Sequence, residues 1–185
     1  MPEPNACINR ATTGDAEALS RLSASVFPLG CPADTKPEDL AEYINQQLTP
    51  ERFRVMLEDD RIVILIVTIS DKLVGYALIA HGASHPQGRL SAPCELRKFY
   101  IDAAYHGRGV ADALMRDVIS AVVDGCEGAL WLSVFSGNQR AISFYQRWGF
   151  RICGSQDFYV GTDCQKDYLM QREETVARNE GPQCK

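Results

Sequence analysis

Residues 99–111 read Phe99-Tyr100-Ile101-Asp102-Ala103-Ala104-Tyr105-His106-Gly107-Arg108-Gly109-Val110-Ala111. The aromatic and β-branched start predicts the end of a strand, the two glycines predict a tight turn, and apolar residues at helical spacing follow. Glycines directly before a helix leave backbone N–H groups bare, and the helix N-terminus carries roughly half a positive charge. The segment therefore predicts a strand, a phosphate-binding turn and a helix, in that order.

This glycine pattern excludes two common nucleotide-binding motifs. A dinucleotide fingerprint needs G-x-G-x-x-G, and Asp112 stands where the third glycine would be. The Gly-Lys-Ser/Thr sequence of a P-loop does not occur in the chain. The phosphate ligand is therefore expected to belong to another class of cofactor.

Strands and helices alternate along the rest of the chain. Strands are predicted at residues 6–12, 61–70, 73–80, 95–101, 129–135, 150–159 and 165–170, with a hairpin turn at Asp71-Lys72. Helices are predicted from residue 13, over 37–48, from 49, from 110 and over 138–148. This order predicts one mixed α/β domain over residues 1–172, followed by a flexible polar tail at 173–185.

The composition is that of an ordinary globular chain. The 185 residues include 19 Lys or Arg and 24 Asp or Glu, which gives a formal net charge of −5. This mild acidity disfavours a general nucleic-acid binder and suits a small cationic substrate. The longest aliphatic run, residues 62–67, is far shorter than the ~20 residues that span a bilayer, and no secretory signal is visible. Because the seven cysteines are scattered and odd in number, we expect reduced thiols in a cytoplasmic protein without nucleic-acid or membrane partners.

A second informative segment runs from Asn138 to Phe150 and predicts an amphipathic helix that ends at a glycine. Asn138 and Tyr145 lie seven residues apart, about two helical turns, so they share a face with Ala141 between them. Taken alone, this pattern is typical of a helix cap, a small packing residue and a buried aromatic.

Together, the two segments resemble the GNAT acetyltransferase superfamily. Residues 106–111 are similar to its Q/R-x-x-G-x-G/A signature, with His106 in place of Gln or Arg. Residues 138–150 are similar to its N-x-x-A-x-x-F-Y-x-x-x-G-F element. The resemblance covers about residues 6–171 and implies the GNAT acyl-CoA N-acyltransferase fold. That fold is a mixed, mostly antiparallel sheet with helices on both faces, in which the parallel strands at 95–101 and 129–135 splay apart.

A narrower resemblance points to one group within this superfamily. Trp131-Leu132-Ser133-Val134, and the pattern from Phe158 to Met170, resemble the PaiA-type bacterial polyamine acetyltransferases. The resemblance implies a small primary amine as acceptor, with spermidine and spermine as the first candidates.

The resemblance also implies acetyl-CoA as co-substrate and no metal. The backbone of Phe99, Tyr100 and Ile101 is expected to pair with pantetheine, and the amide of Ile101 to polarise the thioester carbonyl. Asn138 is expected to bond the pantetheine arm. The pyrophosphate is expected to lie on the turn and the helix start, which comprise His106, Gly107, Arg108, Gly109, Val110, Ala111 and Asp112.

An alkyl amine must lose a proton before it can attack a thioester. With a pKa near about 10.4, only a fraction of about 10^−3.4 is neutral at pH 7, a burden of about 4.6 kcal/mol. Glu95 matches a glutamate often used as the base in the superfamily, so it is expected to take this proton directly or through water. Some members carry a carboxylate at the position of Ser133, and its absence here leaves Glu95 with less competition. Tyr145 is expected to hydrogen-bond the leaving thiolate.

Alternatives to polyamine acetylation remain open at this level. The acceptor can instead be an amino acid, an aminoglycoside or a protein N-terminus, and a non-catalytic acyl-CoA-binding sensor is a different class. A homodimer is expected by analogy alone, because many relatives pair through edge strands. Four acidic residues fall where this fold builds its acceptor wall, although a solvated helix face is the preferred interpretation: Asp34, Glu38, Asp39 and Glu42.

Overall fold

The computed structural model describes residues 6–88, 94–123 and 129–173. Apart from its first residue, the predicted tail at 173–185 lies outside them. The elements, in chain order, are β1 (Ala6–Arg10), η1 (Thr13–Asp15), α1 (Ala16–Val26), η2 (Phe27–Gly30), α2 (Pro37–Gln47), α3 (Pro50–Glu58), β2 (Ile62–Ile69), β3 (Lys72–His81), β4 (Cys94–Ile101), η3 (Ala103–Tyr105), α4 (Val110–Val123), β5 (Ala129–Phe135), α5 (Gln139–Arg147), β6 (Arg151–Val160) and β7 (Asp163–Glu173).

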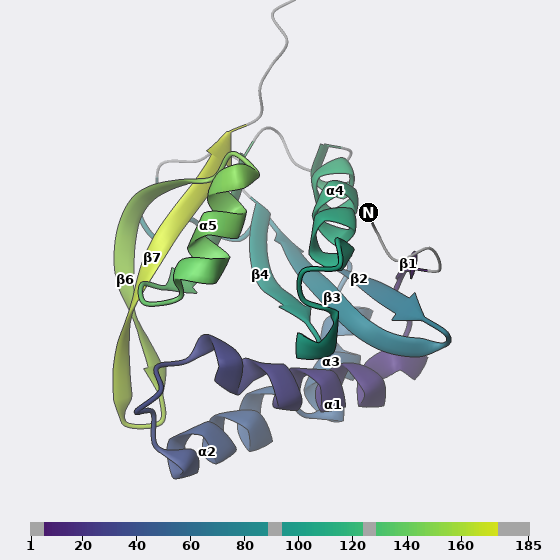
Figure 1. The fold of residues 1–185 in the computed structure, drawn as a ribbon, viewed down its shortest axis with the longest axis horizontal. Coiled ribbons are helices and arrows are strands. Elements are labelled where there is room, and N and C mark those ends of the chain that lie inside the picture. Colours follow the sequence, from purple (N-terminus) through teal and green to yellow (C-terminus); the bar gives the residue numbers. More distant parts are fainter. Residues whose placement is uncertain (1–5, 89–93, 124–128, 174–185) are drawn as a thin grey trace, which may run out of the picture.

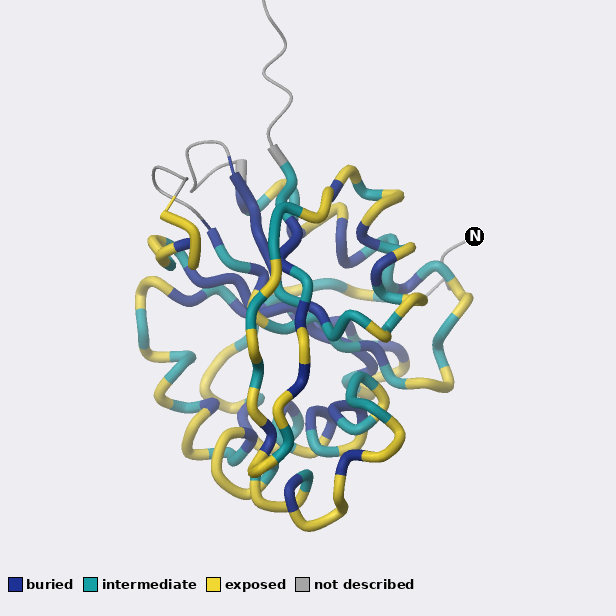
Figure 2. The backbone as a smooth tube through the Cα atoms, turned by 90° about the vertical axis from the view of Figure 1, so that its left-hand side faces the viewer, coloured by how far each residue is buried: buried dark blue, intermediate teal, exposed yellow. Residues whose placement is uncertain are grey.

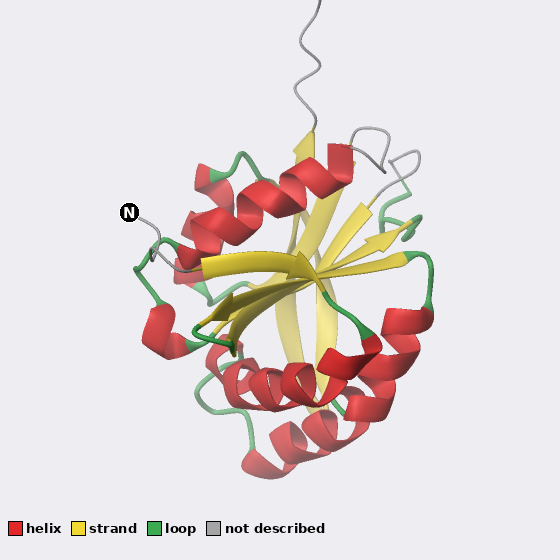
Figure 3. Ribbon diagram, turned by 90° about the vertical axis from the view of Figure 1, so that its right-hand side faces the viewer, coloured by secondary structure: helices red, strands yellow, loops and turns green. Residues whose placement is uncertain are grey.

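The strands form a 7-stranded sheet in the order β1-β2-β3-β4-β5-β7-β6. The β4–β5 pair is parallel and the other neighbouring pairs are antiparallel. Helices α1 and α3 pack on one face and α4 and α5 on the other, as Figures 1 and 3 show. We call these the α1–α3 face and the α4–α5 face. The mixed sheet with helices on both faces confirms the predicted fold class.

The strand patterns explain this layering. In β5, Leu130, Leu132 and Val134 belong to the core under α4 and α5, so Trp131 and Ser133 face the other way. Buried residues concentrate in the central strands, whereas the β6–β7 hairpin keeps many exposed positions (Figure 2). Among the helices of the described part, none combines the length and apolar character that a membrane span requires.

Local sequence signals set several element boundaries. Thr49 caps α3 by accepting a hydrogen bond from the Arg52 backbone at 3.3 Å, with Pro50 in the first turn as predicted. The β2–β3 turn is at Ser70 and Asp71, one residue before the predicted position. The tight turn needs left-handed backbone, which Ser70 (φ 49°) and Asp71 (φ 61°) adopt, whereas Lys72 already pairs with Ile69.

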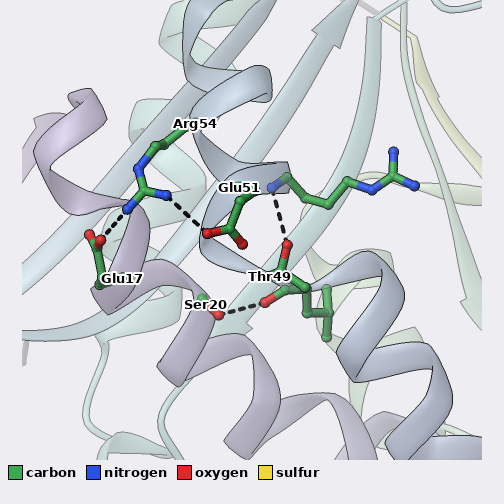
Figure 4. A network of polar contacts seen from close by, with 7 residues as sticks. Glu17, Ser20, Thr49, Glu51 and Arg54 are labelled. Carbon is green, nitrogen blue, oxygen red and sulfur yellow. Dashed lines mark hydrogen bonds and ion pairs between the residues drawn. The ribbon is translucent and has the colours of Figure 1, made fainter.

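Polar contacts fix α3 against α1, as Figure 4 shows. Arg54 bridges Glu17 of α1 and Glu51 of its own helix. Ser20 of α1 donates a hydrogen bond to the Leu48 carbonyl at 2.6 Å, just before α3 begins. These contacts hold the helical cover of the α1–α3 face in place.

Among the cysteines in the described part of the chain, the prediction of reduced thiols is wrong for Cys94. Cys94 is disulfide-bonded, whereas Cys7, Cys31 and Cys164 are free thiols. Sequence spacing could not show this, because a disulfide depends on the distance between the two cysteines in the fold.

Candidate active site

The site lies where β4 and β5 separate. Within the described residues, the two strands pair only at Cys94–Leu130 and Glu95–Trp131, after which β4 follows β3 and β5 follows β7. A bulge in β4 accompanies the separation, because Leu78 pairs with Lys98 and Ile79 with Leu96, which leaves Arg97 as the extra residue. The expected splay of these two strands is therefore present.

Hydrogen-bond alternation identifies which β4 residues face the gap. The Asp102 amide donates to the Val74 carbonyl at 2.8 Å, in register with the β3–β4 pairs, so Tyr100 also bonds to β3. The alternating residues, Phe99 and Ile101, direct their backbone N–H and C=O groups away from β3, into the gap. The backbone of Tyr100 thus serves the sheet, while Phe99 and Ile101 can pair with an extended ligand.

The glycine turn has the backbone geometry that a phosphate cradle requires. Gly107 and Gly109 have φ values of 74° and 78°, in the left-handed region that favours glycine. The first hydrogen bond of α4 runs from the Ala113 amide to the Gly109 carbonyl at 3.0 Å. The amides of residues 110–112 precede this bond and have no helical carbonyl to donate to. They can therefore hold an anion such as pyrophosphate.

The carboxylate of Asp112 is turned away from this cradle. It accepts a hydrogen bond from the Trp148 indole at 3.1 Å and lies 4.0 Å from the Arg147 guanidinium. The charge of its side chain is thus partly balanced at the end of α5. Its backbone amide remains among the free amides at the start of α4.

His106 joins the turn to β4 and α5. Its Nδ1 contacts the Arg140 guanidinium, which has only donors, so Nδ1 is the acceptor. The proton is therefore on Nε2, which donates to the Ile101 carbonyl at 3.0 Å. Sequence reasoning missed Arg140, because the histidine that it contacts is 34 residues away.

Helix α5 contributes Asn138 and Tyr145. Asn138 caps the helix by accepting from the Ala141 amide at 3.1 Å, as the pattern predicted, and its amide nitrogen remains available as a donor. The Tyr145 ring lies edge-on to Phe99, with the ring centroids 6.3 Å apart. Burial raises the pKa of the Tyr145 hydroxyl, which makes it a weaker acid than free tyrosine.

Glu95 lies on the α1–α3 face, opposite to Cys94 and Leu96. Its Oε2 accepts from Arg97 Nε at 3.0 Å and Arg97 Nη2 at 2.8 Å. The Glu95 side chain is 18% exposed, so it keeps access to solvent beside the gap.

The acidic group at α2 divides into two kinds. Asp34, Glu38 and Glu42 are exposed, as a solvated face predicts. Asp39 is instead buried, and it accepts hydrogen bonds from the Thr162 amide at 3.2 Å and the Thr162 hydroxyl at 3.1 Å. The prediction of a solvated face is therefore wrong for Asp39, which fastens α2 to the β6–β7 turn.

A second buried carboxylate lies beside the gap. Ser133 of β5 donates to Asp167 Oδ2 of β7 at 2.9 Å, and Asp167 is 5% exposed. Burial raises the pKa of Asp167, and the Ser133 hydrogen bond partly opposes this. Sequence reasoning gave Asp167 no role. The available sequence signal was its position two residues from Gln165, because alternate residues of a strand lie on the same face of the sheet. The structure buries both side chains.

Aromatic residues of α2 and its neighbours cover this part of the sheet. Tyr43 stacks on Phe27 with ring centroids 4.4 Å apart and meets Phe158 edge-on at 5.9 Å.

No group of three or more His, Cys, Asp or Glu side chains suited to a metal ion occurs within residues 6–88, 94–123 and 129–173.

Comparison with known proteins gives one consistent result. The sequence model of the acetyltransferase (GNAT) family matches residues 23–150. An uncharacterised N-acetyltransferase of Mycobacterium tuberculosis is 37% identical over 159 residues, covering 86% of this chain and 97% of the relative. The spermine/spermidine N(1)-acetyltransferase of Bacillus subtilis is 31% identical over 88 residues, which is 46% of this chain and 57% of that protein.

A solved structure shows the same fold. The PaiA N-acetyltransferase of Thermoplasma acidophilum, in complex with coenzyme A, superposes with a TM-score of 0.75 at 16% identity. The match covers 92% of this chain and 99% of that chain.

Proposed function

The chain belongs to the acetyltransferase (GNAT) family and is an acetyl-CoA-dependent N-acetyltransferase, and on that premise we propose that its acceptors are polyamines such as spermidine and spermine. The observation that carries the proposal is the pair of carboxylates, Glu95 and Asp167, on the α1–α3 face of the strand gap. A polycation gains from two carboxylates under an aromatic cover. The partial match to a spermine/spermidine acetyltransferase and the likeness to a PaiA enzyme also support it.

The chain offers matching groups to each part of acetyl-CoA, which supplies the acetyl thioester. The amides of residues 110–112 would hold the pyrophosphate at the start of α4. The backbone groups of Phe99 and Ile101 would pair with the pantetheine arm, to which the Asn138 amide would also donate. Arg108 and Arg140, which flank the turn, add positive charge.

The direction of β4 suggests which amide polarises the thioester carbonyl. The phosphate cradle lies beyond the C-terminal end of β4, so an arm that runs back along the strand passes Ile101 before Phe99. Tyr145, the expected thiolate partner, also contacts Phe99. We therefore assign the polarising role to the Phe99 amide in place of the Ile101 amide.

The remaining chemistry concerns two protons. Glu95 is proposed to accept a proton from the amine, directly or through water, from its solvent-accessible position. Tyr145 is proposed to donate a hydrogen bond to the thiolate as it leaves. Because burial raises the pKa of this hydroxyl, stabilisation by a hydrogen bond is favoured over full proton transfer.

The test is thiol release from acetyl-CoA with a panel of spermidine, spermine, lysine, an aminoglycoside and a short peptide, read against an amine-free blank. The proposal predicts turnover with the polyamines and little with the others. Turnover confined to another amine would replace the polyamine assignment. Acetyl-CoA binding without turnover on any amine would favour a sensor.

A further inference from the structure

Asp167 differs from the other buried polar groups near the strand gap in having an unused oxygen. Asp39 accepts two hydrogen bonds from Thr162, and the Gln165 amide donates to Thr35 at 3.2 Å and to Asp163 at 2.9 Å. In the described part of the chain, the only hydrogen bond to the Asp167 carboxylate is that of Ser133 to Oδ2. No fully buried side-chain oxygen there lacks a partner, so Asp167 Oδ1 must still reach solvent.

The position of Asp167 connects this oxygen to the reaction. Ser133 lies two residues beyond Trp131, the last β5 residue to pair with β4, so it borders the open part of the gap. Ser133 and Glu95 lie on the same face of the sheet. The Ser133 hydroxyl therefore holds the Asp167 carboxylate on the side of the gap opposite to Tyr145 and α5.

The groups around Asp167 form a mostly uncharged wall. Burial raises the pKa of the Cys31 thiol to about 11, and the charges of Asp163 and Asp167 add to that effect. Burial also raises the pKa of Tyr43, with smaller contributions from Cys31 and Asp167. Near neutral pH, both side chains are therefore neutral, and a carboxylate among them attracts a cation strongly because water is largely excluded.

We propose that Asp167 forms the site for the reacting ammonium group of the acceptor: Oδ1 binds the ammonium and removes its proton, while Ser133 holds Oδ2. The proposal rests on the proposed function and refines it, because it moves the proton-accepting step from Glu95 to a carboxylate on β7. Glu95 is then left to attract a second ammonium group of the polyamine.

The proton balance is simple. One proton moves from the ammonium to Asp167, which later releases it to water. The neutral nitrogen forms a C–N bond with the acetyl carbon as the C–S bond breaks. The second proton lost by the nitrogen is transferred to the CoA sulfur. The products are the N-acetylated amine and CoA, and one proton is released to solvent.

Burial makes Asp167 suited to this work at a cost to the fold. Its raised pKa makes it a stronger base than an exposed aspartate, yet the ionised form is disfavoured inside the protein. When the pKa of a carboxyl is raised in the folded state, the protein loses stability as the pH rises through that pKa. Asp167→Asn should therefore keep or increase the melting temperature at neutral pH, whereas removal of a purely structural carboxylate should lower it.

The experiment compares wild type, Asp167→Asn and the matched control Asp157→Asn. Asp157 is an exposed β6 carboxylate paired with Lys166. For Asp167→Asn, we expect kcat/KM for spermidine to fall by about 100-fold or more, the usual contribution of a general base. The acetyl-CoA Kd and the melting temperature should be preserved, and Asp157→Asn should match wild type.

The pH profile provides a second readout. Wild-type kcat/KM should decrease toward acid as Asp167 is protonated, and Asp167→Asn should lose this limb of the profile. Glu95 and Asp163 are present in both proteins, so they cannot cause a difference between the two profiles. The pKa values of Cys31 and Tyr43 are raised, so these groups affect the alkaline side of the profile. An acidic limb that persists in Asp167→Asn would assign the base to another group and overturn the proposal.

The outcomes distinguish failure of the Asp167 site from failure of the proposed function. Wild-type turnover with unchanged Asp167→Asn kinetics would overturn the Asp167 site and leave the proposed function intact. Loss of activity together with a lower melting temperature or lost acetyl-CoA binding would assign Asp167 a structural role. If wild type neither acetylates nor binds any amine of the panel in the presence of CoA, the proposed function fails and the Asp167 site fails with it.

Discussion

The start of α4 and the β6–β7 hairpin both border the site, but contacts of very different range build them. At α4, glycines and free amides within a few residues form the cradle. At the hairpin, Asp39 meets Thr162 across 123 residues, and Thr35 meets Gln165 across 130. The part that fits acetyl-CoA is thus encoded locally, whereas the part proposed to receive the amine is assembled by tertiary structure.

The largest expected effect separates chemistry from binding on the locally encoded side. Tyr145→Phe should lower kcat by about 100-fold, because it removes the hydroxyl that is proposed to stabilise the leaving thiolate. The acetyl-CoA Kd from calorimetry should stay the same, since the buried ring and its contact with Phe99 remain. Tyr159→Phe, at an exposed tyrosine of β6, is the control. An unchanged kcat would remove Tyr145 from the mechanism.

The difference in contact range also explains what the sequence could predict. The Thr49-Pro50 helix start and the Asn138 cap follow from residues no more than three positions apart. The glycine turn is equally local, because the backbone needs positive φ at Gly107 and Gly109. The strand pair that splays was suggested by the resemblance to the family.

Residues with distant partners escaped prediction for a physical reason. Asp39 and Glu38 are neighbouring acids on one helix, and only contact with Thr162 makes Asp39 buried. Asp167 reads as one polar residue among several on β7, and its place beside the gap depends on Ser133 of another strand. Alternation on β7 places Asp167 on one face with Gln165, but the contacts with Thr162 and Ser133 leave no trace in the sequence.

The next prediction tests the distant contacts directly. Asp39→Ala should lower the free energy of unfolding in urea by about 2 kcal/mol, because two hydrogen bonds to a buried carboxylate are lost. The KM for the amine should rise while the acetyl-CoA Kd does not change. Glu38→Ala, at the exposed neighbour, should leave both quantities at their wild-type values. Equal effects of the two variants would contradict a special role for Asp39.

A third prediction tests the cradle with a matched pair of glycines. A Cβ at Gly107 or at Gly88 would meet nothing within 4 Å, and both residues have positive φ, 74° and 62°. Valine at either position should therefore cost about 1–2 kcal/mol of backbone strain. Gly107→Val should weaken acetyl-CoA binding by about tenfold, whereas Gly88→Val should affect stability alone. Equal acetyl-CoA affinity in the two variants would refute the cradle.

The smallest effect is expected at His106, which joins the turn to β4 and α5. His106→Ala removes the hydrogen bond to the Ile101 carbonyl, worth about 1 kcal/mol, so acetyl-CoA binding should weaken by about fivefold. His106→Gln keeps an N–H donor and should recover most of the affinity. If both variants bind like wild type, the Ile101 contact does not order the cofactor side.

A crossed pair of titrations tests the division between the two regions most directly. CoA is titrated into wild type, Gly107→Val and Asp167→Asn, and spermidine is then titrated into each protein saturated with CoA. We expect weakened CoA binding only in Gly107→Val and lost spermidine binding only in Asp167→Asn. Spermidine affinity that is equal in wild type and Asp167→Asn would contradict it.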